Sequence, residues 1–394
     1  MIHFETIDAA TFLNEYWQKK PLVIRQALPD FISPLSADEL AGLALEEDVE
    51  SRMVFETPGK TSQWQLKRGP FTEKSFQDLP KSHWTLLVQG VDKLVPEVAD
   101  ALHHFDFIPQ WRIDDVMVSY AAKEGSVGPH YDNYDVFLYQ AHGQRKWSLT
   151  TKNCNLGNAL KDTALRIMAT FDVEEEYILS PGDMLYLPPH VGHHGVSLDN
   201  DCMTYSFGYR SYQGQELWES LGDYLSERGA FRALYQDPNW AKMSAPSVLP
   251  PEASQKAKQL LMNILEDEHV LQSWFGCFAT QLDSQSEQYM ALPIEEEHWG
   301  NPSLFVKALL NDAGLRRDAA CRFAYQENSE KDGLQLFING CEWETEGVSK
   351  ELIKHVANHR LMSVNELIPF LNDEKNQVFL HDLWKLQWLQ FINE

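Results

Sequence analysis

Cysteine is scarce in this sequence, and no long uninterrupted apolar run occurs. The five cysteines include no C-x-x-C pair, which argues against a disulfide framework and against a cysteine-rich zinc site. The first twenty residues lack the apolar core of a secretion signal, and no stretch approaches the roughly 18 apolar residues of a membrane span. These absences predict an unexported protein in a reducing cytoplasm, with no membrane association.

The sequence also lacks a surplus of positive charge. Its 33 basic and 58 acidic residues give a formal net charge of -25 at pH 7. Such a charge opposes non-specific binding to nucleic acid and to anionic membranes. A basic protein partner would suit this charge, although a generally acidic, well-solvated surface is the simpler interpretation.

Apolar and aromatic residues, by contrast, are plentiful. They make up 43% and 12% of the 394 residues, which is typical of a globular chain. The length exceeds the roughly 250 to 300 residues at which a single core stops growing, so we expect more than one unit. The pattern along the chain divides it into residues 1–212, 213–285 and 286–394.

The first of these parts is predicted to be mainly β. Residues 1–110 mix helix and strand signals, with a short strand over 21–25 and a capping box at Ser36 and Glu39. From Val116 to Arg210, short β-branched and aromatic runs alternate with turn residues, which is typical of a barrel or sandwich. These runs are 116–120, 136–140, 146–149, 177–179, 184–187 and 203–209.

The remainder is predicted to be mainly helical. Leu217, Leu221, Tyr224 and Leu225 lie on one face of a helix, and a second helix is expected over 252–265. Beyond it we expect a helix over 304–310, a β-hairpin within 322–343, a helix capped by Ser363-x-x-Glu366 and a helix over 378–391. Helices combined with a hairpin suggest a winged-helix-like unit.

The motif with the most chemical content is His130-Tyr131-Asp132. Two residues apart on a strand, His130 and Asp132 project from the same face, so both can reach one ion. Alone the motif is weak, because 14 histidines in an acidic chain produce such a pair by chance. A second copy, His104-Phe105-Asp106, has no comparable partner hairpin, and we treat it as a chance match.

A third ligand comes from the segment running from Pro181 to His193. It contains a turn, an apolar strand, a proline stop and then histidine, in the spacing Gly182-x5-Pro188-x4-His193 of the second cupin barrel motif. Two histidines and one carboxylate with open positions form the facial triad of non-haem Fe(II) oxygenases, whereas structural zinc has four protein ligands. His190 and His194 compete for the third position, but His194 would face the other side of an extended segment.

A co-substrate with a free carboxylate would need a cation in the barrel. Arg145 lies at the start of the run after 136–140, and its planar guanidinium suits two-point carboxylate binding. The alternative is a solvated turn arginine beside Lys146.

Together these motifs resemble the JmjC ribosomal oxygenases. The resemblance rests on His130-x-Asp132, residues 135–147, Pro188-Pro189 and His193, with the early segment 15–22 in support. It implies a double-stranded β-helix (jelly-roll or cupin) domain over 1–212, a helical dimerisation segment over 213–285 and a winged-helix-like domain over 286–394. It also implies Fe(II), 2-oxoglutarate and O2 as cofactors, with iron held by His130, Asp132 and His193.

The resemblance further assigns Arg145 and, with it, Ser206 to the distal carboxylate of 2-oxoglutarate. Within the family the sequence looks most like the bacterial branch that hydroxylates an arginine of large-subunit ribosomal protein L16. A homodimer that acts on a ribosomal protein is therefore expected. Direct DNA binding is not expected, because residues 378–391 carry Lys385 as their only basic residue apart from His381. The histidine-rich turn at His190 departs from the family pattern and leaves an additional metal-binding mode open.

Two other hypotheses remain open from the sequence alone. One is a cupin-type small-molecule dioxygenase or isomerase that does not use 2-oxoglutarate. The other is a non-catalytic JmjC scaffold or ligand sensor. Hydroxylation of a ribosomal peptide that depends on Fe(II) and 2-oxoglutarate would distinguish the ribosomal-protein hydroxylase from both of these alternatives.

Overall fold

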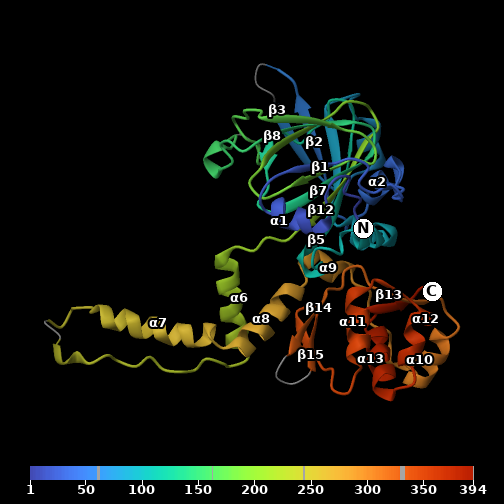
Figure 1. Cartoon of the computed structure of the whole chain (residues 1–394). Helices are drawn as coiled ribbons and strands as arrows, with labels where there is room; N and C mark the ends of the chain where they lie inside the picture. Colours follow the sequence, from blue (N-terminus) through green and yellow to red (C-terminus); the bar gives the residue numbers. More distant parts are fainter. Residues whose placement is uncertain (60–62, 162, 243–244, 329–332, 394) are drawn as a thin grey trace. The chain divides into compact units, whose positions relative to one another are not determined.

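The computed structural model describes residues 1–59, 63–161, 163–242, 245–328 and 333–393 (Figure 1). The chain divides into two compact units, Met1–Ser211 and Tyr212–Glu394. In the part that the structure describes, no helix combines the length and the apolar character needed to cross a bilayer.

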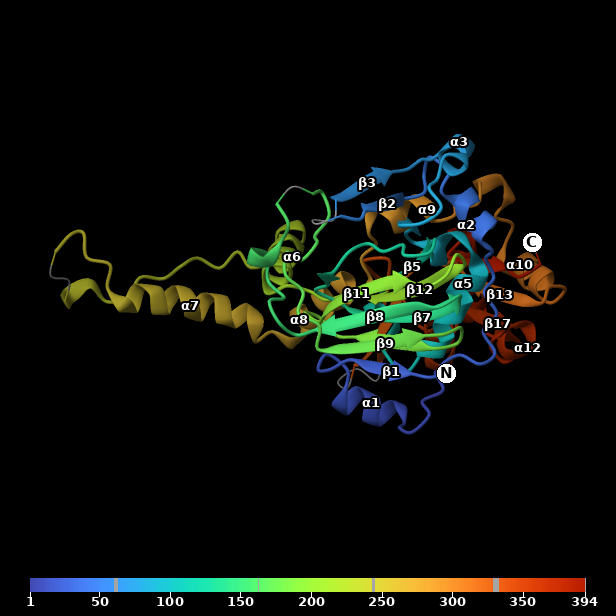
Figure 2. The ribbon, with the colours of Figure 1, turned by 90° about the horizontal axis from the view of Figure 1, so that it is seen from above.

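Two antiparallel sheets form the first unit (Figure 2). The larger sheet has the strand order β1-β10-β7-β12-β5-β4-β2-β3, and the smaller has the order β6-β11-β8-β9. Strands β5 to β12, four from each sheet, face one another as a double-stranded β-helix, which confirms the predicted fold class. The strands are β1 (Leu22–Ile24), β2 (Ser51–Thr57), β3 (Gln63–Arg68), β4 (Trp84–Val88), β5 (Ile113–Ala121), β6 (His130–Tyr131), β7 (Asp135–His142), β8 (Arg145–Thr150), β9 (Glu175–Leu179), β10 (Met184–Leu187), β11 (Gly192–Ser197) and β12 (Cys202–Tyr209).

Strand β7 shows how the two faces of the larger sheet differ. Successive side chains of a strand point to opposite faces. Phe137 and Tyr139 belong to a large aromatic core shared with the N-terminal segments, whereas Val136 and Leu138 belong to a smaller apolar cluster with Trp147 of β8. The barrel interior therefore lies on the side of the even-numbered residues of β7.

Short helices pack against the outer, aromatic face of the larger sheet. They are α1 (Ala9–Glu15), α2 (Ala37–Leu43), α3 (Glu73–Gln77), α4 (Val91–Leu94) and α5 (Pro96–Asp100). The predicted capping box is present at the start of α2, where Ser36 and Glu39 cap one another. Phe12 of α1 is fully buried and contacts Phe137 and Tyr186 ring to ring. The expected strand near residue 22 is also present, as β1 at the edge of the sheet.

The second unit begins with helices, as predicted. These are α6 (Gly214–Glu227), α7 (Pro251–Leu265), α8 (Glu268–Thr280) and α9 (Ser284–Tyr289) (Figure 1). Leu221 and Leu225 of α6 pack with Trp274 and Phe278 of α8, so the apolar face read from the sequence is the packed face.

The rest of the second unit combines helices with two small sheets. The elements are α10 (Pro302–Leu309), β13 (Gly314–Arg317), β14 (Phe323–Asn328), β15 (Gly333–Ile338), β16 (Cys341–Trp343), α11 (Lys350–Asn358), β17 (Leu361–Ser363), α12 (Val364–Leu367), α13 (Glu374–Lys385) and β18 (Leu389–Phe391). Within the described residues the sheets have the orders β17-β13-β18 and β14-β15-β16. The tip of the predicted hairpin, 329–332, lies outside the described residues.

Two predictions in this unit were wrong in detail. The helix expected over 378–391 ends at Lys385, and residues 389–391 form strand β18 instead. The C-cap at Leu386 and the positive φ of Gln387 end the helix, and Leu389 then pairs with Arg317 of β13. Helix α11, which carries buried Leu352, Ile353 and Val356, was missed altogether.

Candidate metal and co-substrate site

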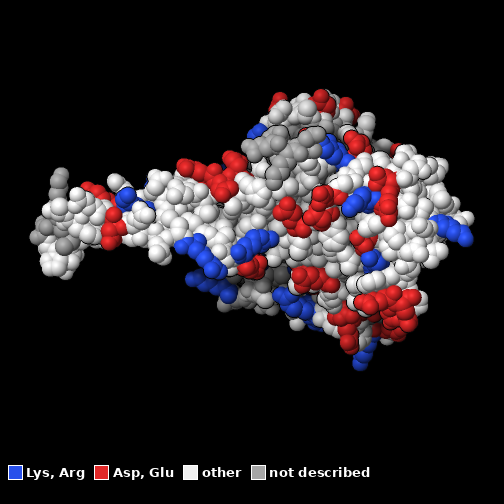
Figure 3. Space-filling model, turned by 90° about the horizontal axis from the view of Figure 1, so that it is seen from below, with Lys and Arg blue, Asp and Glu red and all other residues white. Residues whose placement is uncertain are grey.

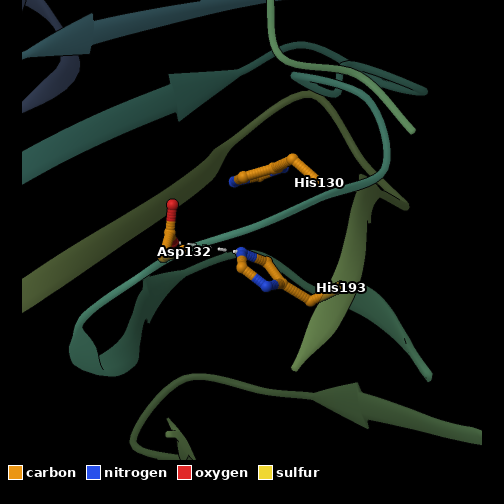
Figure 4. A group of neighbouring side chains, drawn as sticks. All are labelled: His130, Asp132 and His193. Carbon is orange, nitrogen blue, oxygen red and sulfur yellow. Dashed lines mark ion pairs between the residues drawn. The ribbon is translucent and has the colours of Figure 1, made fainter. Parts of the chain in front are cut away.

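His130 and His193 face one another directly across two paired strands. His130 lies in β6 and His193 in β11, and the register aligns these two residues as Cα partners. The centroids of their imidazole rings are 4.2 Å apart. Asp132 follows β6, and one of its carboxylate oxygens is 3.6 Å from Nε2 of His193 (Figure 4). One potential ligand atom from each of the three residues lies within 4.8 Å of the other two.

Both imidazoles are oriented by backbone carbonyls. Nδ1 of His130 lies 2.9 Å from the carbonyl oxygen of Gly128, and Nδ1 of His193 lies 3.1 Å from that of Val191. A carbonyl only accepts, so the proton of each neutral ring is on Nδ1 and the lone pair is on Nε2. Backbone carbonyls commonly fix metal-binding histidines in this tautomer.

The electrostatics favour a neutral ring at His193. Burial, together with the nearby His130 ring, lowers the pKa of His193 to about 4. A neutral imidazole offers a free lone pair, whereas an imidazolium offers none. Two neutral nitrogens and one carboxylate are donors that suit a divalent first-row metal ion.

Gly128 sets the approach to His130. Its φ of +86° is in the region that favours glycine, and a Cβ there would lie 2.9 Å from the side chain of Ile167. A larger residue would therefore have to displace Ile167 or change the path of the chain into β6.

The other histidines near the turn do not join this group. His190 is exposed, has a φ of +64° and faces the ring of Tyr131. His194 follows His193 on β11 and lies beside Phe171, on the other face of the strand. His104 lies elsewhere, in a short 3-10 helix that is next to the amino group of Met1 in space, and its ring contacts that of His103.

Arg145 is a buried cation without a carboxylate partner. It is the first residue of β8, is 4% exposed, and its Nε donates a hydrogen bond to Sγ of Cys202 over 3.3 Å. Its guanidinium lies 5.7 Å from the ring of Trp147, and Nη2 is buried with no hydrogen-bond partner. Within the described ranges no carboxylate pairs with Arg145. A buried charge left in this state is costly unless a ligand supplies the counter-charge.

One cavity connects these groups. It has a volume of about 390 Å³ and is lined by the three clustered residues, by Arg145 and by Ser206. Ser206 is 7% exposed and pairs with Leu138 of β7. No described residue forms a side-chain hydrogen bond with its hydroxyl, so the group is free to bind a ligand.

Sequence reasoning missed the far side of this cavity. Residues from β2, β3 and β4 line it, including Arg52, Leu66, Arg68 and Thr85. Residues 51–57 and 63–68 were interpreted only as part of a lead-in, although the alternation of 63–68 is the signal that could have identified a strand. Arg166, from the loop between β8 and β9, also lines the cavity.

Comparison with known proteins agrees with this architecture. A JmjC-domain model matches residues 100–217, and a model for the ROXA-like winged helix matches residues 259–390. The ribosomal protein uL16 3-hydroxylase of Escherichia coli is 36% identical over 276 residues, which cover 70% of this chain and 72% of that protein. A probable ribosomal oxygenase of Haemophilus influenzae is 34% identical over 374 residues, covering 90% of this chain and 87% of the relative.

Solved structures extend the likeness to the whole chain. An X-ray structure of E. coli YcfD has a TM-score of 0.84 at 30% identity, covering 99% of this chain and all of that one. A second structure shows YcfD, a ribosomal oxygenase, in complex with cobalt and 2-oxoglutarate, with a TM-score of 0.81 at 29% identity and coverage of 98% and 99%. The fold and the histidine–carboxylate cluster thus define a JmjC-domain protein. The chain belongs to the ribosomal oxygenases.

Proposed function

We propose that this chain is an Fe(II)- and 2-oxoglutarate-dependent protein hydroxylase whose iron is held by His130, Asp132 and His193. The observation that carries the proposal is the convergence of two Nε2 lone pairs and one carboxylate on a single point, with ligand atoms within 4.8 Å of one another. Three protein ligands leave other coordination positions of a metal open. When bound there, Fe(II) and 2-oxoglutarate activate O2, so that succinate, CO2 and a hydroxylated side chain are formed.

The role we propose for Arg145 is to bind the distal carboxylate of 2-oxoglutarate. Its Nη2 is a buried donor without a hydrogen-bond partner, Arg145 lines the cavity, and a planar guanidinium binds a carboxylate through two parallel hydrogen bonds. Ser206 lines the same cavity, and we propose its hydroxyl as a second donor to this carboxylate. The ring of Trp147 lies beside both Arg145 and His193, and we propose that it helps to position these two side chains.

As the prime substrate we propose an arginine of a large-subunit ribosomal protein of the uL16 type, hydroxylated in the cytoplasm. Support comes from the E. coli relative, which is a ribosomal protein uL16 3-hydroxylase. The net charge of -25 favours encounter with a basic protein. On the face drawn in Figure 3, acidic side chains form dense patches with basic ones between them.

For the second unit we propose two roles in binding other proteins. Helices α6 and α7 expose Trp218, which is 54% accessible, and Leu261, which is 43% accessible, and we propose that a second copy of the chain covers them in a homodimer. Helix α13 mixes acidic Glu374 and Asp382 with basic Lys375 and Lys385. A helix that reads DNA needs a basic face, so we propose a protein contact for this unit rather than direct DNA binding.

The test is a reconstituted reaction. The full-length chain, Fe(II), 2-oxoglutarate and a uL16 peptide containing arginine should give a gain of about 16 mass units on the peptide, with one succinate per hydroxylation. His130→Ala and Asp132→Ala should abolish both products. Succinate without peptide oxidation, or peptide oxidation without 2-oxoglutarate, would contradict the proposal.

A further inference from the structure

The inner face of the larger sheet continues well beyond the metal cluster. Thr204 of β12 pairs with Ser119 of β5, and this row of paired residues then crosses β4, β2 and β3 through Leu87, Arg52 and Arg68. All five residues line the cavity. Neighbouring strands are about 4.8 Å apart, so the row extends about 14 Å from Thr204 to Arg52.

Two arginines occupy the outer end of this row. Arg52 of β2 and Arg68 of β3 are direct partners across an antiparallel pair, and their side chains therefore share one face. Like charges directly opposite one another destabilise a strand pair. Arg166 reaches the same cavity from the loop between β8 and β9.

The described residues provide no carboxylate for these three arginines. Arg52 contacts a sulfur instead, with Nη2 at 3.6 Å from Sδ of Met117, and sulfur is a weak acceptor. Neither Arg68 nor Arg166 forms an ion pair in the described ranges, and both are exposed. The only acidic side chain among the described residues lining the cavity is that of Asp132.

The proposed cofactors do not use this charge. The two negative charges of 2-oxoglutarate and the one of Asp132 are balanced by Fe(II) and Arg145. Arg52, Arg68 and Arg166 then remain as surplus positive charge, although the chain as a whole is strongly acidic. A local charge opposite to the net charge indicates selection of a particular ligand group rather than general steering.

We propose that Arg52, Arg68 and Arg166 form an anion subsite that binds a carboxylate side chain of the substrate polypeptide, a few residues from the residue that is hydroxylated. The inference rests on the proposed function and adds a sequence requirement for its substrate. A carboxylate is favoured over an RNA phosphate because a net charge of -25 opposes approach to nucleic acid. At about 3.3 Å per residue of extended chain, the row of about 14 Å from Thr204 to Arg52 offers room for roughly four residues of a substrate polypeptide.

The experiment uses two matched peptides from a uL16-type protein, each containing the target arginine. One peptide keeps its acidic residues, and the other has each of them replaced by the corresponding amide. Steady-state hydroxylation and fluorescence-anisotropy binding are measured for the unaltered chain, for Arg68→Gln and for Arg52→Gln. The matched control is Lys67→Gln, which removes the same charge from the next residue of β3, whose side chain lies over Phe55 on the opposite face.

For the acidic peptide, Arg68→Gln should lower kcat/KM roughly two- to fivefold through KM, as expected for loss of one exposed charge-assisted contact. For the amide peptide, Arg68→Gln and the unaltered chain should be equal, and Lys67→Gln should behave like the unaltered chain with both peptides. Equal losses for the two peptides, or none, would overturn the subsite. A loss seen only with assembled ribosomal subunits would identify an RNA phosphate and overturn it as well.

Failure of the subsite can be told apart from failure of the proposed function. If the chain hydroxylates both peptides with the same KM, the function stands and the subsite falls. If no hydroxylation occurs, anisotropy still decides the subsite, because peptide binding needs no turnover.

Discussion

Nε of Arg145 donates a hydrogen bond to Sγ of Cys202 over 3.3 Å, and both residues are buried. Gln140 donates to the same sulfur, also over 3.3 Å. A thiol is a weak acceptor with no formal charge, so it holds the guanidinium in place without neutralising it. The positive charge of Arg145 remains available to a ligand.

Cys202→Asp should disable this arrangement. A carboxylate at this position would pair with Arg145 inside the protein and compete with the distal carboxylate of 2-oxoglutarate. We expect KM for 2-oxoglutarate to rise about tenfold or more, because charged hydrogen bonds contribute about 1.5–3 kcal/mol. Succinate release as a function of 2-oxoglutarate concentration measures it, with Cys202→Ser as the control that should change KM little. An unchanged KM in a folded Cys202→Asp chain would contradict the role of Arg145.

Removing the cation itself gives a complementary prediction. Arg145→Gln should weaken 2-oxoglutarate binding by about 10- to 100-fold while metal binding is retained, since the lost contact is a charge-assisted pair. Quenching of tryptophan fluorescence in the Mn(II)-loaded chain reports this affinity. Lys146→Gln, on the next residue and paired with Glu176 outside the cavity, is the matched control. Loss of metal binding in Arg145→Gln would mean that Arg145 is structural.

Metal binding should stabilise the folded chain. At about 100 times the dissociation constant, a bound ion adds about 2.7 kcal/mol to the free energy of unfolding, seen as a higher Tm on addition of Co(II) or Mn(II). His130→Ala and Asp132→Asn should remove this increase. His190→Asn should keep it, because His190 lies outside the cluster and asparagine tolerates its positive φ. An increase that survives in His130→Ala but not in His190→Asn would place the metal at the turn.

Acid should destabilise the apoprotein partly through His194. Burial lowers the pKa of His194 to about 4, below its ordinary value of 6.5. Between these values the unfolded chain binds more protons than the folded chain, so stability is full above pH 6.5 and falls toward pH 4. Burial raises the pKa of Asp115 to about 7, and this group opposes the trend in the same range.

His194→Gln should therefore flatten the dependence of stability on pH. Between pH 7 and 4.5, we expect the variant to lose about 1–2 kcal/mol less unfolding free energy than the unaltered apoprotein. Urea unfolding of both proteins at several pH values measures this difference in unfolding free energy. Parallel curves for the two proteins would show that His194 is not protonated on unfolding.

The proposed homodimer predicts a change of mass in solution. Trp218→Glu or Leu261→Glu places a charge on an exposed apolar position of α6 or α7, where it would be buried between copies. Sedimentation should show monomers for these variants and dimers for the unaltered chain. Ile32→Glu, at an apolar residue that is 87% exposed in the other unit, should leave the dimer intact. A monomeric unaltered chain would disprove the proposal.

Local patterns in the sequence were enough to locate most of the barrel strands and the three clustered residues. Strands β5, β7, β8, β9, β10 and β12 are short apolar runs between turn residues, and the α2 cap depends only on Ser36 and Glu39. His130 and His193 could be assigned to one site because of two local motifs. His130-x-Asp132 has the spacing of two ligands on one face of a strand, and Gly182-x5-Pro188-x4-His193 has the spacing of the second cupin barrel motif. The meeting of their rings is set by the register of β6 and β11.

What could not be predicted depends on contacts between distant segments. Strand β6 has only two residues and exists through its pairing with β11, so it has no periodicity of its own. The role of β2 and β3 depends on their attachment to β5 through β4, because only the assembled sheet brings Arg52 and Arg68 to the cavity. The end of α13 likewise depends on a distant segment, because Leu389, just beyond the helix, pairs with Arg317 of β13.

The alternation along β7 has a consequence for how this protein can diversify. Phe137 and Tyr139 serve the aromatic core, whereas Val136 and Leu138 line the cavity. Mutations at even positions can therefore reshape what the cavity accepts while the odd positions preserve the architecture. The two faces of this eight-residue strand thus separate the residues that maintain the fold from the residues that determine which substrates the cavity accepts.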